Sequence, residues 1–249
     1  MQKTRTKLLY FHGGGLITGH KNDYPKQYVD QLHRLNYEFI GFDYPLAPAT
    51  SLEEILDACT TFVKQYSQDD YVLMGRSAGA YLVINTLENL YKANEKLPKK
   101  VVLFYGYENF DVPAFYMKKK YPTTILKSQI LPYYDEQKSS DPLYHRALLY
   151  LYARQEGIWS EIIKSTSNLT HRQCSILTSD QMPLTFIAHS ANDQDVPYAE
   201  SKKLNQKITG STLKTVYYLD HEFDLEINNP QTVTVMNELW YFLAQEPFQ

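Results

Sequence analysis

A serine held between two glycines is the best-placed nucleophile in this chain of 249 residues. It is Ser77, in the segment Gly75-Arg76-Ser77-Ala78-Gly79. The apolar run Tyr71–Met74 before it predicts a buried strand, and Ala80–Ile84 after it predicts a buried helix. Ser77 would then lie on a sharp strand-to-helix turn, at the positive end of a helix dipole. Such a turn raises the hydroxyl from the backbone, where it can attack a carbonyl carbon.

Acyl transfer by a serine also needs a base and a carboxylate that orients the base. Among the seven histidines, His221 follows the last apolar run, Thr215–Leu219, and is predicted to be the base. Asp193 follows the preceding run, Leu184–Ala188, and is predicted to be the orienting acid. Asp195 lies in the same loop and competes with it. We expect Asp195 instead to cap the helix that begins near Tyr198, or to bind the loop backbone.

The developing oxyanion needs backbone N–H donors. One is predicted at Ala78, directly after Ser77. Gly14 and Gly15 are predicted to supply the others, because a glycine run after an early strand lets the main chain approach a substrate. His12 precedes this run and is expected to stabilise the loop rather than act as a second base.

Short apolar runs alternate with helical patterns along the chain, which favours a mostly parallel sheet with helices on both faces. Ser51 and Glu54 predict a capping box at one helix start, and Asn229-Pro230 predicts the start of the last helix. The stretch from about 108 to 182 has no clear strand and one helical pattern, 144–163. We interpret this stretch as an insertion over the carboxyl edge of the sheet. The expected strands are Lys7–Phe11, Glu38–Phe42, Tyr71–Met74, Val101–Tyr105, Leu184–Ala188 and Thr215–Leu219.

Net charge, the length of the apolar stretches and the cysteine content argue against several classes of protein. A net charge of −3 without a clustered basic face argues against a nucleic-acid partner. No apolar stretch is long enough for a membrane span. Two cysteines, Cys59 and Cys174, fit a reducing compartment, so a cytoplasmic protein is expected. Neither has histidine or cysteine neighbours at metal spacing, and no metal or organic cofactor is predicted. The oligomeric state stays open, a homodimer included.

Five segments together resemble the α/β-hydrolases, and specifically the carboxylesterases and lipases of the hormone-sensitive-lipase type. The resemblance spans nearly the whole chain. It implies one domain over 1–249, with Ser77 as nucleophile, Asp193 as acid and His221 as base. It also implies an oxyanion hole at Gly14, Gly15 and Ala78, and a small cap formed by the insertion. The segments are His12-Gly13-Gly14-Gly15, Asp43-Tyr44-Pro45-Leu46-Ala47-Pro48, Gly75–Gly79, Asp193 with Val196-Pro197, and His221-Glu222-Phe223.

The chain also departs from these relatives. The first two strands of the usual fold are expected to be missing, leaving about six. Arg76, Pro45 and Glu222 stand where the relatives often have an acidic residue, arginine and glycine. We expect these changes, Arg76 above all, to affect substrate preference.

The resemblance implies a serine hydrolase that cleaves small carboxylic esters, with short acyl chains, through an acyl-enzyme on Ser77. Two alternatives stay open. The same residues could act on a peptide, arylformamide or acetylated-sugar bond. The fold could also serve as a non-catalytic receptor for small molecules, although some receptors of this kind have lost the histidine that His221 represents here.

Overall fold

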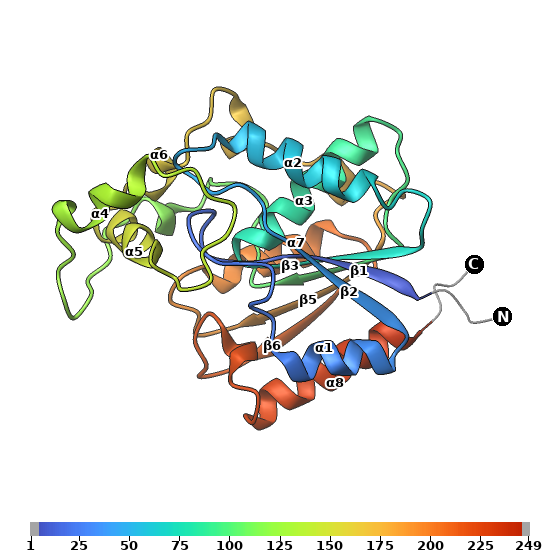
Figure 1. The fold of residues 1–249 in the computed structure, drawn as a ribbon. Helices are drawn as coiled ribbons and strands as arrows, with labels where there is room; N and C mark the ends of the chain where they lie inside the picture. Colours follow the sequence, from blue (N-terminus) through green and yellow to red (C-terminus); the bar gives the residue numbers. More distant parts are fainter. Residues whose placement is uncertain (1–4, 246–249) are drawn as a thin grey trace.

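The computed structural model describes residues 5–245, and within them a single sheet of six parallel strands forms the centre of the molecule (Figure 1). The strand order is β2-β1-β3-β4-β5-β6. The predicted parallel α/β sheet is therefore confirmed. The strands are β1 (Thr6–Phe11), β2 (Tyr37–Phe42), β3 (Tyr71–Arg76), β4 (Lys100–Phe104), β5 (Leu184–Ser190) and β6 (Thr212–Val216).

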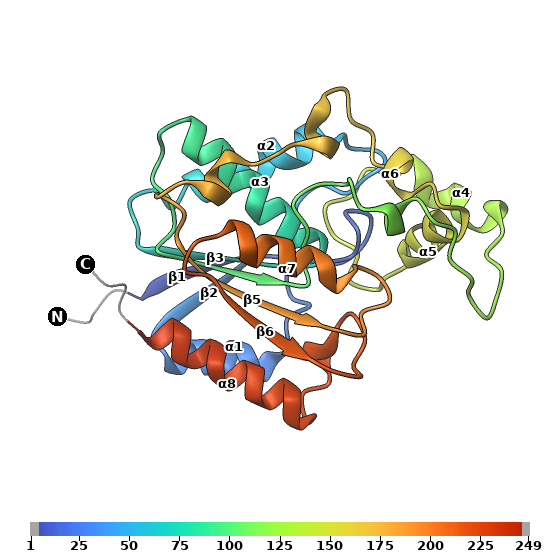
Figure 2. The ribbon, with the colours of Figure 1, turned by 180° about the vertical axis from the view of Figure 1, so that it is seen from behind.

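Helices cover both faces of the sheet (Figure 2). One face carries α2 (Leu52–Lys64), α3 (Ala78–Lys92) and α7 (Tyr198–Lys207), and the other carries α1 (Lys26–Arg34) and α8 (Pro230–Ala244). Because strand side chains alternate between faces, the continuous apolar runs supply two cores. In β1, for example, Leu9 packs in the core under α2 and α3, whereas Leu8 packs in the core with α1 and α8.

Two predicted helix starts are confirmed. The Ser51 side chain accepts the Glu54 N–H, and the Glu54 carboxylate accepts the Ser51 N–H, which completes the capping box of α2. The Asn229 side chain accepts the Gln231 N–H at the start of α8, where Pro230 takes the first helical position. These helix starts depend only on neighbouring residues, which explains why the sequence predicts them.

The segment between β4 and β5, residues 105–183, contains no strand, and its helices lie beyond the carboxyl ends of the strands (Figure 1). We call it the β4–β5 segment. It holds α4 (Lys127–Tyr134), α5 (Ala147–Glu156) and α6 (Trp159–Ile162), and three short 3₁₀ turns at Pro113–Phe115, Asn168–His171 and Ser175–Thr178. The helix predicted over 144–163 is wrong as one element. Gly157 ends α5 in a left-handed conformation, with φ of 72°, and α6 begins two residues later.

The last strand also differs from the prediction. The run Thr215–Leu219 was expected to be the strand, but β6 ends at Val216. Register against β5 sets this limit, since Phe186 pairs with Thr212 and Ser190 pairs with Val216. Beyond it, Tyr218 has a φ of 66° and is 91% exposed, so the chain turns away from the sheet. The Ser190 hydroxyl holds this turn by donating to the Leu219 carbonyl, which places His221 over the sheet edge.

Candidate active site

Ser77 lies on a tight turn between the central strand β3 and α3. Its φ of 53° is uncommon for a residue with a side chain, and its N–H donates to the Phe104 carbonyl of β4 over 2.9 Å. Glycines permit the close packing around it. A Cβ at Gly79 would lie 2.1 Å from the Phe11 carbonyl oxygen, and one at Gly75 would lie 2.3 Å from the Gly79 oxygen. The predicted strand–turn–helix setting is therefore present.

The structure brings Ser77, His221 and Asp193 into one hydrogen-bonded chain. His221 Nε2 lies 2.9 Å from Ser77 Oγ, and His221 Nδ1 lies 2.6 Å from Asp193 Oδ2. Since a carboxylate only accepts, the Nδ1–H of His221 donates to Asp193. Nε2 is then free to accept from the Ser77 hydroxyl. Three loops at the carboxyl edge of the sheet, after β3, β5 and β6, supply the three residues.

Burial and hydrogen bonds have opposite effects on the pKa values of Asp193 and His221. Burial alone would favour protonated Asp193, but hydrogen bonds from His189 and His221 outweigh it and hold the pKa of Asp193 well below its ordinary value. Burial likewise disfavours a charged His221 ring. The hydrogen bond and charge of Asp193 outweigh that burial, so the pKa of His221 lies above its ordinary value. Asp193 is therefore an anion that stabilises an imidazolium at His221.

A second histidine contacts the same carboxylate. The fully buried His189, in β5, places Nε2 2.8 Å from Asp193 Oδ2 and accepts a 2.7 Å hydrogen bond from Ser201 through Nδ1. The other carboxylate oxygen of Asp193 accepts the N–H groups of Asp195 and Val196. The sequence alone assigns His189 no role. Its position four residues before Asp193, at the end of an apolar strand, was the available signal for its role beside the carboxylate.

Asp195 does not have the predicted role. It neither caps α7, whose first flanking residue is Pro197 without a side-chain cap, nor accepts from the loop backbone. Its carboxylate instead binds Lys119 at 2.6 Å, Arg154 at 3.3 Å and the Tyr150 hydroxyl. All three partners come from the β4–β5 segment. Because they lie far away in sequence, the local pattern around Asp195 could not predict them.

The carbonyl groups of the glycine loop all accept hydrogen bonds. The Tyr44 hydroxyl donates to the His12 and Gly13 carbonyls, Ile17 and Thr18 N–H groups donate to Gly14 O, and Trp159 Nε1 donates to Gly15 O over 2.9 Å. Gly14 and Gly15 have φ values of 91° and 61°. Within residues 5–245, no hydrogen-bond acceptor pairs with the N–H groups of Gly14, Gly15 or Ala78. These donors are available to a ligand.

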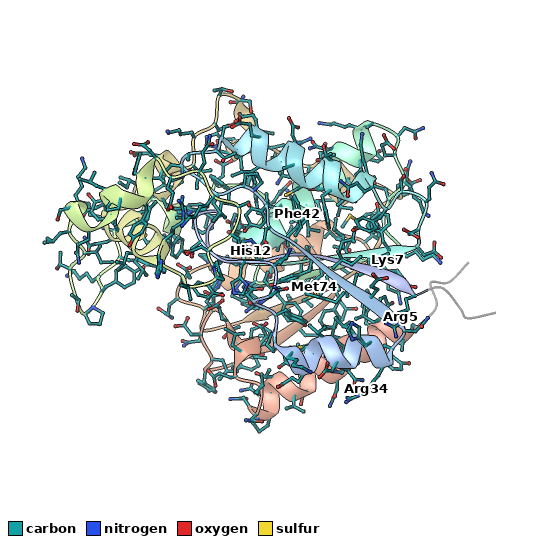
Figure 3. All side chains as sticks on the ribbon, in the orientation of Figure 1. Arg5, Lys7, His12, Arg34, Phe42 and Met74 are labelled. Carbon is teal, nitrogen blue, oxygen red and sulfur yellow. The ribbon has the colours of Figure 1, made fainter. Side chains whose placement is uncertain are left out.

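His12 is a buried part of the same loop. It lies just past the end of β1 that faces the β4–β5 segment (Figure 3). Its ring stacks on Tyr44 with centroids 4.1 Å apart, and its Nδ1 is 2.9 Å from the Gly13 carbonyl. These contacts match the predicted role in stabilising the loop.

The buried Arg76 side chain extends into a cluster of three carboxylates. Its guanidinium lies 3.0 Å from Asp224, 3.4 Å from Asp23 and 3.5 Å from Glu222. Two of these partners, Glu222 and Asp224, lie one and three residues after His221 in sequence. Arg76 therefore anchors the His221 loop, and its position does not support the expected effect on substrate preference.

A narrow pocket opens beside Ser77. Its volume is about 10 Å³, which is room for roughly one water molecule. Aromatic rings of the β4–β5 segment close it, and one charged side chain, Arg154, is among its walls. The lining residues are Gly15, Ser77, Tyr107, Phe115, Tyr150, Arg154, Trp159 and Val196.

The described part of the chain offers neither a cluster of metal ligands nor a membrane-spanning helix. Between residues 5 and 245, no group of three or more histidine, cysteine, aspartate or glutamate side chains is arranged to hold a metal ion. No helix in that range is both long and apolar enough to cross a membrane.

The chain is similar to known α/β hydrolases in sequence and in fold. A crystallised α/β hydrolase superfamily protein from Enterococcus faecalis is 29% identical, with a TM-score of 0.88 over 99% of this chain and 93% of that one. A solved esterase of the bacterial hormone-sensitive lipase family shares the fold, with a TM-score of 0.66 at 18% identity, over 97% of this chain and 77% of that one. An esterase of Acinetobacter venetianus is 29% identical over 112 residues, which cover 43% of this chain and only 37% of that protein.

A family model also matches most of the chain. A family model described as alpha/beta hydrolase fold matches residues 8–223, from β1 to the loop after His221. That range includes the glycine loop, the serine turn and both late loops. The chain therefore belongs to the alpha/beta hydrolase fold family.

Proposed function

We propose that this protein is a serine hydrolase that cleaves carboxylic esters of short acyl groups through an acyl-enzyme on Ser77. The observation that carries the proposal is the continuous hydrogen-bonded chain from Ser77 Oγ through His221 to Asp193. A serine hydroxyl is a weak nucleophile until an adjacent base takes its proton. Here the base is oriented by a buried carboxylate whose pKa is low enough to keep it charged.

The reaction follows from these positions. His221 Nε2 takes the Ser77 proton as Oγ forms a bond to the ester carbonyl carbon. The resulting oxyanion accepts hydrogen bonds from the unpaired N–H groups of Gly14, Gly15 and Ala78, and one such donor commonly contributes about 3 kcal/mol. His221 then gives its proton to the leaving alkoxide as the carbon–oxygen bond breaks. Water, activated by His221, attacks the acyl-enzyme and releases the acid.

The size of the pocket supports short acyl groups. The space beside Ser77 is small, about 10 Å³, and aromatic rings surround it, so a short acyl group fits there more easily than a long chain. The esterase name of the Acinetobacter relative supports the ester bond. The same small pocket favours one second candidate, the hydrolysis of an arylformamide, because formyl is the smallest acyl group.

A fluorophosphonate probe with an ester panel tests the proposal. The probe should label Ser77, as mapped by peptide mass spectrometry, and purified protein should hydrolyse p-nitrophenyl acetate faster than p-nitrophenyl octanoate. An aryl N-formylamine in the same panel decides between ester and formamide. An unlabelled Ser77, with every ester intact, would favour the non-catalytic receptor.

The pH dependence of kcat/KM gives an independent check on His221. Only unprotonated His221 accepts the Ser77 proton, so activity should be lost as pH falls through the pKa of this residue. Since that pKa is raised, the acid inflection should lie above the ordinary histidine value of about 6.5. Rates with p-nitrophenyl acetate, measured from about pH 5 to about pH 9, locate it. An inflection well below the ordinary histidine value would contradict the assigned environment of His221.

A further inference from the structure

A buried arginine is the one charged side chain in the wall of the Ser77 pocket. Arg154, near the end of α5, is 1% exposed, and its guanidinium carbon lies 5.3 Å from the centre of the Phe115 ring. The other side chains of the wall are mostly aromatic. A buried cation loses its hydration, so a guanidinium in a mostly apolar wall costs free energy unless other groups compensate its charge.

The contacts of Arg154 leave part of its hydrogen-bonding capacity unused. Its Nη2 donates to the Asp195 carbonyl over 3.1 Å and lies 3.3 Å from the Asp195 carboxylate. Its Nε is buried and has no hydrogen-bond partner among residues 5–245. An unpaired buried donor destabilises the folded state, and more so when it is charged. A ligand oxygen that reaches the guanidinium from the pocket that Arg154 lines would reduce this cost.

The charges around Arg154 favour an anionic ligand. Asp195 is shared between two cations, because Lys119 lies 2.6 Å from the same carboxylate oxygen that Arg154 approaches. One carboxylate cannot balance both. The guanidinium therefore keeps part of its positive charge for a group within the pocket.

The pocket is on the acyl side of the scissile bond. His221 must protonate the leaving alcohol, so that alcohol lies next to His221 Nε2. The residues that line the pocket include Ser77 and Gly15 but not His221. A group in this pocket is therefore attached to the carbonyl carbon on the side away from the leaving group.

We propose that Arg154 selects short acyl groups that carry an oxygen acceptor near the scissile carbonyl, either a hydroxyl or, more strongly, a carboxylate. This inference rests on the proposed ester hydrolysis. It narrows the substrate class from short esters in general to esters of small hydroxy acids or half-esters of short dicarboxylic acids. The aromatic wall excludes water, which strengthens the hydrogen bond from the guanidinium.

Matched ester pairs test the role of Arg154. Ethyl glycolate is compared with ethyl propionate, which replaces a hydroxyl by a methyl group. Monoethyl malonate is compared with ethyl 3-methylbutanoate, which replaces the carboxylate by an isopropyl group of similar shape. The measured quantity is the ratio of kcat/KM within each pair, in wild type, Arg154→Met and Arg154→Lys. Comparing ratios between proteins cancels the intrinsic reactivity of each ester.

We expect Arg154→Met to lower the malonate ratio by at least about tenfold, because the acyl carboxylate loses a charge-assisted hydrogen bond from the guanidinium. Arg154→Lys keeps the charge but loses the guanidinium geometry, so its ratio should fall between the other two. It also tests the inference if the methionine variant does not fold. Lys118→Met is the control, because it removes an exposed cation from the same segment without touching the pocket. Its ratios should equal those of wild type.

The two proposals fail in distinguishable ways. A fall confined to the malonate pair supports selection of an anionic oxygen, and a fall confined to the glycolate pair supports selection of a neutral one. Equal ratios in wild type and both Arg154 variants, with ethyl propionate still hydrolysed, overturn this inference alone. No hydrolysis of any of the four esters by wild type overturns ester hydrolysis itself.

Discussion

Replacing Ser77 by alanine is expected to lower kcat for a short ester by at least about a thousandfold. The substitution removes the oxygen that forms the acyl-enzyme, while the N–H donors of Gly14, Gly15 and Ala78 stay in place. Residual turnover would then come only from those donors and from substrate binding. The rate is measured with p-nitrophenyl acetate, with titration of active sites to exclude traces of wild-type protein.

The same variant should keep its fold. Alanine at position 77 is expected to keep the same backbone conformation, and within residues 5–245 the only side-chain hydrogen bond lost is the one with His221 Nε2. The urea midpoint of Ser77→Ala should therefore stay close to that of wild type. Ser211→Ala is a matched control, because its hydroxyl bonds to residues 205 and 208, far from the site. Substantial ester hydrolysis by folded Ser77→Ala would rule out Ser77 as the nucleophile.

Asp193→Asn should lower kcat by about ten-thousandfold. Asp193 Oδ1 accepts two backbone N–H groups, from Asp195 and Val196, so the amide oxygen of an asparagine must take that position. Its NH₂ group then faces His221 Nδ1, where Asp193 Oδ2 is now an acceptor 2.6 Å away. The ring is forced to carry its proton on Nε2 and can no longer accept from Ser77.

The pH profile separates this effect from general damage to the site. Loss of the negative charge should also move the acid inflection of the residual kcat/KM to lower pH, because Asp193 contributes most to raising the pKa of His221 against burial. Asp195→Asn is the companion variant, since Asp195 makes no hydrogen bond to His221, and it should retain far more activity. Equal losses in the two variants, with the same inflection, would show that Asp193 does not orient the base.

Much of this molecule follows from short-range sequence patterns. The order of strands and helices follows from apolar runs that are continuous in covered strands and helically spaced in helices. The capping box at Ser51 and the cap at Asn229 depend on residues within one helical turn. Ser77, Asp193 and His221 were predictable because each follows its own strand, and parallel strands end at one edge.

The position of His221 depends on strand pairing as well as on the local sequence. The predicted strand Thr215–Leu219 was displaced, because only pairing with β5 decides that β6 ends at Val216. The histidine still reaches Ser77, since the turn at Tyr218 carries it back over the sheet edge. An apolar run marks a strand approximately, whereas its register depends on a neighbour that lies elsewhere in the chain.

The sequence by itself determined the order of strands and helices and the candidate residues Ser77, Asp193 and His221. Only the tertiary structure decided which other groups surround them. His189 behind Asp193, the pairing of Asp195 with Lys119, and the Arg154 wall all join residues from different segments. The physical reason is range: helix periods, caps and glycine turns act over a few residues. The partner of a buried charge is instead selected by how distant segments pack.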